Sequence, residues 1–443
     1  MNMNSKLLLL LPPLLLLSGC SSFGEGLARG FMNRETEDTR QCYVRGPGFD
    51  GIEQQIDSTT EAGPKQGGDV KVLMVHGIGT HLPGYSTRLA ENLARELGLG
   101  VVERTPKVIG LRLHVHPRVF EEAVARGMMR GELDEPNGTV TLQRYSSKDG
   151  SRAMTFYELT WSEITEPDKR VINYDSSGDY SFRRAALNHE LKEFINNHLP
   201  DPLIYLGDAQ GNIQTSVTQA LCWMFTRDYE QVPQHTDEAC EFYGYTPDEL
   251  RNDSYSFISH SLGSRILTDS LQSITATVAY GQGTNSDETL KVATQWVDIL
   301  QNESLSIFML SNQLPLLQLG RPPPQVTNQF TNYCTAEGDK QAGRVFAESR
   351  LIAFSDPNDI LSWSVPPGYE DQYLDSRMCP VLNNVIINVA EVKKVLGFEL
   401  APAGEAHRNY DNDERVIKLM AHGIGEDKAD PLIKERCEWM EVR

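Results

Sequence analysis

The feature that most constrains the fold of this 443-residue chain is an apolar run that leads through a glycine turn into a helical pattern. The apolar run is residues 70–75. It is followed by HGIGT and then by STRLAENLARELGL, in which Leu89, Leu93 and Leu97 recur at helical spacing. A short, nearly all-apolar run is typical of a strand buried on both faces. Because strand, turn and helix form the unit of a parallel α/β sheet, the sequence predicts an α/β fold with a mostly parallel, doubly wound sheet.

Other segments repeat this alternation of apolar runs and helical patterns. Apolar residues recur at helical spacing in SFRRAALNHELKEFINNHL and in IQTSVTQALCWMF, and such patterns separate most of the strand-like runs. No linker rich in proline, glycine and serine divides residues 69–443, so we expect one domain with insertions rather than two domains. The further strand-like runs are residues 153–161, 255–259, 304–311, 350–355 and 383–389.

The charge of the chain argues against one class of partner. The sequence has 41 basic and 61 acidic residues, which gives a formal net charge of −20. Such a surface repels polyanions and anionic headgroups within a Debye length. We therefore expect no nucleic-acid partner.

The N-terminus, MNMNSKLLLLLPPLLLLSGC, has the pattern of an export signal. Lys6 precedes a run that is apolar from Leu7 to Leu17 apart from two prolines. This run is too short for a bilayer core, which needs about 20 residues, but it is typical of a signal peptide. Its end resembles the bacterial lipobox, which implies removal of residues 1–19 and acylation of Cys20. The alternative is an ordinary secretory signal with an incidental cysteine.

The lipobox resemblance also predicts where the chain resides. Ser21 follows the cysteine, whereas aspartate is the residue associated with retention in the inner membrane. We therefore expect a lipid-anchored protein of the bacterial cell envelope, in the outer membrane and facing the periplasm. Residues 20–68 have few apolar residues in periodic order, so they are predicted to be a flexible tether to a domain at 69–443.

Export changes the interpretation of the remaining cysteines. Disulfides are permitted in an oxidising compartment, but the sequence cannot choose among the possible pairings. No pair has the spacing of a zinc site such as C-x-x-C, so we expect no metal ion and no cofactor. The cysteines concerned are Cys42, Cys222, Cys240, Cys334, Cys379 and Cys437.

The segment YSFISHSLGSRIL, residues 255–267, places a serine in a sharp turn between a strand-like run and a helical pattern. A turn alone does not require serine, because glycine and asparagine turn a chain with less strain. The pattern small-x-Ser-x-Gly is that of a nucleophile elbow. Ser261 is the predicted nucleophile, and Ser259 and Gly263 are the small residues that relieve crowding, although Ser259 replaces the usual glycine. The adjacent His260 is expected to pack beneath the turn.

Together these motifs resemble the α/β-hydrolase family of lipases and esterases. The resemblance depends on HGIG at residues 76–79, SHSLG at residues 259–263 and a later aspartate and histidine in the family's order. It covers residues 69–443, although the motifs themselves occupy few positions. A second HGIG, residues 422–425, follows a helical pattern and lacks the strand that should precede the motif.

The resemblance implies a catalytic triad in the order serine, acid, histidine. For the acid, the segment LIAFSDPNDILSW offers Asp359 and Asp356, and Asp359 is preferred because an apolar residue follows it closely. For the base, His407 lies in a predicted loop before a helix, where the family keeps this residue. His422 is the alternative, but it lies at the end of that helix, where a histidine usually interacts with the helix dipole.

An oxyanion needs donors that are already in position. The family uses the backbone N–H of the residue after the nucleophile, which is Leu262 here. It also uses the residue that follows His-Gly after the first strand, which implies Ile78. The flanking Gly77 and Gly79 let the backbone approach a substrate.

The interval between the two motifs is longer than one strand–helix unit needs, which predicts an insertion at about 113–250. Asn137-Gly138 in this segment is a candidate hairpin turn, next to a candidate helix. Residues 312–330 are rich in proline and leucine, so they are either a lid over a pocket or a long surface loop.

The sequence therefore predicts a membrane-anchored serine hydrolase that cleaves carboxylic esters through an acyl-enzyme. The expected partners are an ester or lipid-like substrate and, through the N-terminal lipid, a membrane. A thioesterase or acyltransferase on the same residues is the enzymatic alternative. A surface lipoprotein that uses the fold only as a binding scaffold is the non-catalytic alternative.

Overall fold

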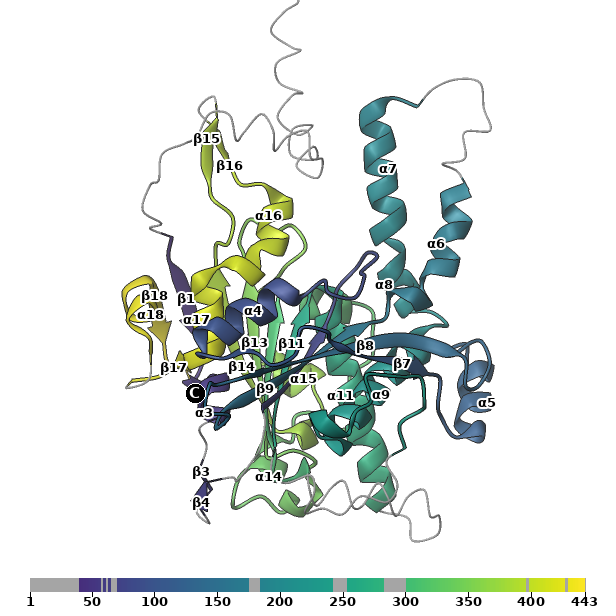
Figure 1. The fold of residues 1–443 in the computed structure, drawn as a ribbon, viewed down its shortest axis with the longest axis horizontal. Helices are drawn as coiled ribbons and strands as arrows, with labels where there is room; N and C mark the ends of the chain where they lie inside the picture. Colours follow the sequence, from purple (N-terminus) through teal and green to yellow (C-terminus); the bar gives the residue numbers. More distant parts are fainter. Residues whose placement is uncertain are drawn as a thin grey trace, which may run out of the picture.

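A computed structural model describes residues 40–56, 59–60, 63–64, 70–174, 184–241, 253–282, 300–395, 398–426 and 429–442. Helices flank a central sheet (Figure 1), which has twelve strands in these described ranges. The short strand β6 (Gly100–Val101) pairs with β8 off the main path. The main path runs β10 (His235–Thr236), β7 (Lys107–Arg112), β8 (Pro136–Ser146), β9 (Ala153–Thr160), β5 (Val70–Val75), β11 (Ser254–His260), β12 (Ser304–Leu310), β13 (Glu348–Ser355), β14 (Pro380–Ile387), β1 (Cys42–Arg45) and β18 (Cys437–Met440).

The strands from β9 to β14 are parallel, whereas β7, β8 and β9 form an antiparallel meander. All residues of β5 are buried, as expected for a strand in the middle of a sheet that is covered on both faces. The predicted α/β class with a mostly parallel sheet is confirmed. Because parallel strands end at the same edge, the residues that follow β9, β5, β11, β12 and β13 lie along one edge of the sheet.

Helices cover both faces of this sheet. Leu73 and Val75 of β5 belong to one buried cluster, which includes α9 (Gln210–Thr226) and α11 (Leu262–Gln282). The alternate residues of β5 belong to a second buried cluster, which includes α4 (Thr87–Glu96) and α17 (Glu414–His422). The alternation of side chains along a strand therefore divides the core into two layers.

The prediction that residues 20–68 are a flexible tether is wrong for its later part. Strand β1 pairs with β14 on one side and with β18 on the other, so it belongs to the central sheet. Cys42 in β1 also forms a disulfide with Cys437 in β18. This strand escaped prediction because it is short and because its partners lie far away in the sequence. Residues 1–19 and Cys20 lie outside the described residues.

The predicted hairpin at Asn137-Gly138 is also wrong. Both residues lie within β8, and the turn between β8 and β9 comes later, where the Ser147 N–H donates to the Arg152 carbonyl. The buried Asn137 amide instead donates to the Asn212 carbonyl of α9, at 2.8 Å. Tertiary contact thus overrides the local preference of this dipeptide for a turn. The helix expected in the same segment is present as α5 (Pro117–Ala125).

Two further disulfides join Cys222 to Cys240 and Cys334 to Cys379. The segment 312–330 contains the short helix α13 (Leu314–Gln318), which is tied to α11 by a 2.7 Å hydrogen bond between Arg265 and Gln318. None of the helices formed by the described residues is both long and apolar enough to cross a bilayer.

Candidate active site

Ser261 occupies a strained turn between β11 and α11. Its φ of 55° lies in the left-handed region, which non-glycine residues rarely adopt. The Ser261 N–H donates to the Leu310 carbonyl at 2.9 Å, which fixes the turn against the end of β12. The Ser261 hydroxyl is buried and has no hydrogen-bond partner among the described residues. Backbone strain together with an unpaired polar group is characteristic of functional sites rather than of turns that only redirect the chain.

The space around this turn explains its small residues. A Cβ on Gly263 would lie 2.3 Å from the Val75 carbonyl oxygen at the end of β5. A Cβ on Gly77 would lie 2.6 Å from the Ser261 Cβ and 2.8 Å from the His260 carbonyl oxygen. The glycine turn after β5 and the serine turn after β11 are therefore in direct contact.

The half-buried His407 and the buried Asp359 form a pair at the same edge of the sheet. His407 lies on α16 (Ala403–Arg408), and its Nδ1 is 2.9 and 3.0 Å from the two carboxylate oxygens of Asp359, which follows β13. Because a carboxylate only accepts hydrogen bonds, Nδ1 carries the proton and Nε2 is left as the basic nitrogen. Burial raises the pKa of Asp359, but the hydrogen bonds and charge of His407 and the hydrogen bond from Ser311 hold it below its ordinary value.

Ser311 is a member of this cluster that the sequence analysis did not identify. Its hydroxyl donates to Asp359 Oδ2 at 2.6 Å and lies 2.8 Å from His407 Nδ1. Ser311 follows β12, the strand between those that precede Ser261 and Asp359, and its φ of 51° is also left-handed. The available signal was a small polar residue directly after the apolar run SLSIFML.

Asp356, the alternative acid, has a structural role. Its Oδ2 accepts the N–H groups of Val389 and Ala390, at 2.7 and 3.1 Å, and its Oδ1 accepts the Asn358 N–H at 2.7 Å. These bonds join the loop after β13 to the segment after β14. No contact joins Asp356 to His407 within the described residues.

His422, the alternative base, lies in a different charged cluster. Its two nitrogens contact Glu53 and Glu96, at 2.7 and 2.8 Å. Ligand atoms of Glu96, His422 and Asp430 lie within 4.8 Å of one another, which is close enough to hold a metal ion. However, the Lys418 ammonium already contacts Glu96 and Asp430, at 2.9 and 3.1 Å. The Lys418 ammonium therefore already balances part of the negative charge of these carboxylates.

His260 packs beside His407, as expected of a residue beneath the turn. The ring centroids are 4.9 Å apart, and His260 Nε2 lies 2.7 Å from the His407 carbonyl oxygen, to which it can donate. Burial, with the charge of His407 as a smaller cause, lowers the pKa of His260 to about 3. A base this weak is poorly matched to proton transfer near neutral pH, so His407 remains the candidate for that role.

The turn formed by His76–Gly79 contacts Ser261 from the β5 side. His76 is held in place by Trp161, whose backbone N–H donates to Nε2 at 3.1 Å and whose indole N–H donates to the His76 carbonyl at 3.0 Å. The Ile78 N–H makes no hydrogen bond within the part of the chain that is described. Leu262 is the first residue of α11, where N–H groups have no partner in the helix. Both predicted oxyanion donors thus lie on the two turns that meet at Ser261, and neither donates to another group among the described residues.

The structure therefore brings Ser261, Asp359, His407, Ile78 and Leu262 to one edge of the sheet. Ser261 Oγ and His407 Nε2 are not hydrogen-bonded to each other in the described structure. In enzymes without substrate such bonds are often long and close only when substrate binds. The arrangement provides a hydroxyl, an imidazole whose Nδ1 is held by a carboxylate, and backbone donors without a partner among the described residues.

A large cavity of about 1030 Å³ lies elsewhere, along β1, β14 and the C-terminal residues. Its walls include Arg40, Tyr43, Asn388, Lys434 and Glu438, but none of the clustered site residues. The chemistry of the Ser261 cluster, rather than cavity size, therefore defines the candidate site.

Comparisons with known proteins identify no relative: no protein-family model, no curated protein and no solved structure matches the chain.

Proposed function

We propose that this protein is a serine hydrolase of the α/β-hydrolase type that cleaves carboxylic esters through an acyl-enzyme. The observation that carries the proposal is the buried hydroxyl of Ser261, which lies in a strained turn and has no hydrogen-bond partner in the part of the chain that the structure describes. The hydrolase expected from the sequence needs such a hydroxyl at the sheet edge that also holds a carboxylate–imidazole pair, whose carboxylate is buried here. Catalysis by general base and nucleophile is the chemistry that this combination supports best.

In the proposed reaction, Ser261 Oγ attacks the ester carbonyl carbon while His407 Nε2 takes the hydroxyl proton. Asp359 keeps the proton on Nδ1 and stabilises the imidazolium that forms. The N–H groups of Ile78 and Leu262 receive the negative oxygen of the tetrahedral intermediate. His407 then returns the proton to the departing alcohol, and a water molecule hydrolyses the acyl-enzyme by the same steps, which releases the acid.

Ester hydrolysis by two serine variants tests this proposal. Ser261→Ala should lower kcat for a p-nitrophenyl ester by about 10⁴-fold or more, because loss of the nucleophile leaves only weak residual catalysis. Ser349→Ala is the matched control, because Ser349 in β13 also has a buried hydroxyl without a partner in the described ranges, but it does not contact Ser261, Asp359 or His407. The control should retain wild-type kcat. Equal activity of the two variants would contradict the proposal, and faster turnover of a matched thioester would favour a thioesterase.

We propose, further, that the chain is anchored in the bacterial outer membrane by acylated Cys20. This proposal depends on the lipobox-like sequence alone. The mass of the N-terminal peptide of the purified protein should show acyl groups on Cys20, and Cys20→Ala should release the protein from membranes. A mature N-terminus without added acyl mass would contradict it.

A further inference from the structure

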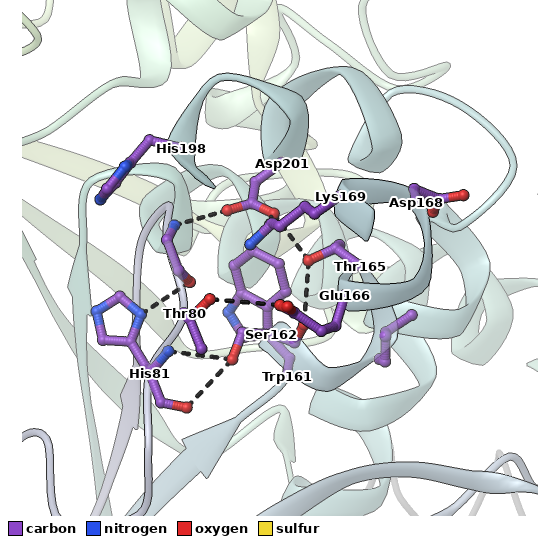
Figure 2. Close-up of polar contacts among 12 residues, drawn as sticks. Thr80, His81, Trp161, Ser162, Thr165, Glu166, Asp168, Lys169, His198 and Asp201 are labelled. Atoms are coloured by element: carbon purple, nitrogen blue, oxygen red, sulfur yellow. Dashed lines mark hydrogen bonds and ion pairs between the residues drawn. The ribbon is translucent and has the colours of Figure 1, made fainter. Parts of the chain in front are cut away.

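Two helices of the predicted insertion place a buried ion pair beside the His76–Gly79 turn, because Asp201 accepts the Gly79 N–H. Figure 2 shows Lys169 and Asp201 together, near Thr80 and His81, which follow this turn. Lys169 lies on α6 (Glu166–Asn173) and Asp201 on α8 (Pro200–Tyr205). Both side chains are 0% exposed, and Lys169 Nζ lies 2.8 Å from Asp201 Oδ1. The contact is an ion pair rather than a well-directed hydrogen bond, since Nζ makes no hydrogen bond within the described residues. Buried ion pairs contribute little net stability, so this pair calls for another explanation.

The Asp201 carboxylate joins the insertion to the turn. Its Oδ2 accepts the Gly79 N–H at 2.6 Å, and its Oδ1 accepts the Thr165 hydroxyl at 2.8 Å. A backbone N–H that donates to a carboxylate forms a charge-assisted bond, which is stronger than one between neutral groups. Gly79 itself has a φ of 98°, so the turn has a backbone conformation that few other residues could adopt.

The residues after Gly79 are held by the same insertion. The Thr80 hydroxyl contacts Glu166 at 3.3 Å, and the His81 N–H donates to the Ser162 hydroxyl at 3.2 Å (Figure 2). A Cβ on Gly79 would lie 2.9 Å from the His198 ring, so the turn is also enclosed from that side. Of these contacts, only that of Asp201 involves a fully buried charge bound directly to the turn's backbone.

We propose that Asp201, neutralised by Lys169, is a positioning residue that sets the peptide planes of the His76–Gly79 turn. This inference rests on the proposed esterase function. By accepting the Gly79 N–H, Asp201 removes that donor from the site and fixes the plane of the Ile78–Gly79 peptide. This in turn restrains the adjoining Gly77–Ile78 peptide, whose N–H is left for the oxyanion. The insertion thereby acts on catalysis without contacting the substrate.

In this proposal, Lys169 offsets the negative charge of Asp201. An isolated carboxylate bound to the turn would repel the negative charge that develops on a tetrahedral intermediate. The Lys169 ammonium cancels most of this field because it lies against the same carboxylate. The pair therefore orients the turn without opposing the oxyanion.

Two double variants separate the hydrogen bond from the charges. Both avoid leaving an unpaired buried charge, which would destabilise the protein strongly. Lys169→Met with Asp201→Asn keeps an acceptor for Gly79, and the Thr165 hydroxyl can accept from the new amide because it also contacts the Ser162 carbonyl at 3.1 Å. Lys169→Met with Asp201→Leu removes the acceptor. The matched control is Lys71→Met with Asp253→Leu, which removes a buried ion pair at the opposite end of β5.

The Leu-containing variant should lose about 10- to 100-fold in kcat with KM little changed, which is less than the loss expected for deleting an oxyanion donor. Its inhibition constant for an alkyl boronic acid should rise by a similar factor, because the tetrahedral boronate uses the same donors. The Asn-containing variant should recover most of kcat. The control pair should lower Tm but leave kcat and boronic acid inhibition unchanged.

Equal kcat and inhibition constants in the Leu- and Asn-containing variants would overturn the positioning role, while wild-type esterase activity would still support the proposed function. A wild-type protein without esterase activity would instead overturn the function on which the inference rests. If the Leu-containing variant does not fold, Thr165→Val decides the question. It removes one anchor of Asp201 and should lower kcat several-fold at constant KM, and unchanged kcat and boronic acid inhibition would overturn the proposal.

Discussion

The sequence H-G-I-G occurs twice in this chain, once as a turn after a strand and once where a helix passes into the short strand β17 (Gly423–Ile424). In the first, His76 is buried at the end of β5, where its ring stacks on His81 and Trp161 at centroid distances of 4.1 and 4.6 Å. In the second, His422 ends α17 and lies between two carboxylates. The same four letters therefore form a neutral turn against Ser261 in one place and a charged junction in the other. Their meaning depends on the element that precedes them.

The pKa values of His76 and His422 are shifted in opposite directions, in agreement with these different surroundings. Burial, with the neighbouring His81 as a second cause, holds the pKa of His76 well below its ordinary value. Burial also lowers the pKa of His422, but its hydrogen bonds to Glu96 and Glu53 outweigh that effect and raise the pKa overall. A charged histidine is thus avoided beside the candidate oxyanion site, whereas a charged histidine is favoured at the second motif.

The largest expected effect separates His407 from the histidine of the second motif. His407→Ala should lower kcat for an aryl ester by about 10⁴-fold or more, because the proposed base is lost. His422→Ala should leave kcat unchanged and lower Tm, because it breaks contacts to Glu53 and Glu96. Steady-state kinetics and thermal unfolding of both variants measure this. A catalytically dead His422→Ala with an active His407→Ala would reverse the assignment.

Asp359→Asn should lower kcat by about 10⁴-fold, because an amide favours the wrong imidazole tautomer of His407. The comparison variant is Asp356→Asn, which weakens bonds to the Val389 and Ala390 N–H groups. It should reduce stability and affect kcat far less. Kinetics on one ester, with circular dichroism as the check on folding, distinguish the two. Loss of catalysis only in Asp356→Asn would place the acid there.

The glycines of the two HGIG motifs should differ in their effects: Gly77 should affect kcat, whereas Gly423 should affect stability. Gly77→Ala places a Cβ 2.6 Å from the Ser261 Cβ, so the nucleophile or the turn must move, and kcat should fall by about 10²- to 10³-fold. Gly423→Ala places a Cβ against the Phe49 carbonyl at a φ of 70°, so it should lower Tm. When active sites are counted by titration with a fluorophosphonate, the kcat of Gly423→Ala per active site should match that of the wild type. Equal catalytic loss in both variants would show that the two motifs are not specialised.

The smallest expected effect is a difference in pH dependence. His422 binds its proton more tightly in the folded state, so its contribution to stability is full below its ordinary pKa of 6.5 and is lost as the pH rises through the raised pKa. His76 has the opposite sign: it is held neutral, so the unfolded chain gains a proton first, and stability falls as the pH drops below 6.5.

Urea unfolding of wild type, His422→Gln and His76→Gln between pH 5 and 9 tests these signs. The stability advantage of wild type over His422→Gln should shrink as the pH rises. Its advantage over His76→Gln should shrink as the pH falls. The same trend in both comparisons would contradict the assigned charge states.

Much of the parallel sheet was predictable because its strands are short apolar runs with their own signal. Residues 70–75 form β5 with the predicted bounds, and the elbow strand differs from its prediction only at the ends. Strand β1 was not predictable, because its pairing with β14 and β18 depends on contacts across the whole chain. For the same reason Asn137-Gly138 lies within a strand: its local turn preference is weaker than its packing against α9.

The site divides in a similar way. The sharp turn at Ser261 and the position of Asp359, rather than Asp356, beside His407 agree with local sequence signals, because the elbow pattern and the loop position are encoded locally. Ser311 and the Lys169–Asp201 pair did not, because each depends on which strand or helix lies next to the site in space. A single serine after a strand, or a lysine on a short helix, has no distinguishing sequence signal.

The most direct test of the account is to locate a covalent adduct on the wild-type protein. After treatment with a fluorophosphonate, intact mass should show one added phosphonyl group, and peptide mapping should place it on Ser261. Heat-unfolded protein should not react, because the free hydroxyl of a serine is a poor nucleophile without its base. No adduct on the folded protein, or an adduct on another serine, would contradict the claim that Ser261 is the nucleophile.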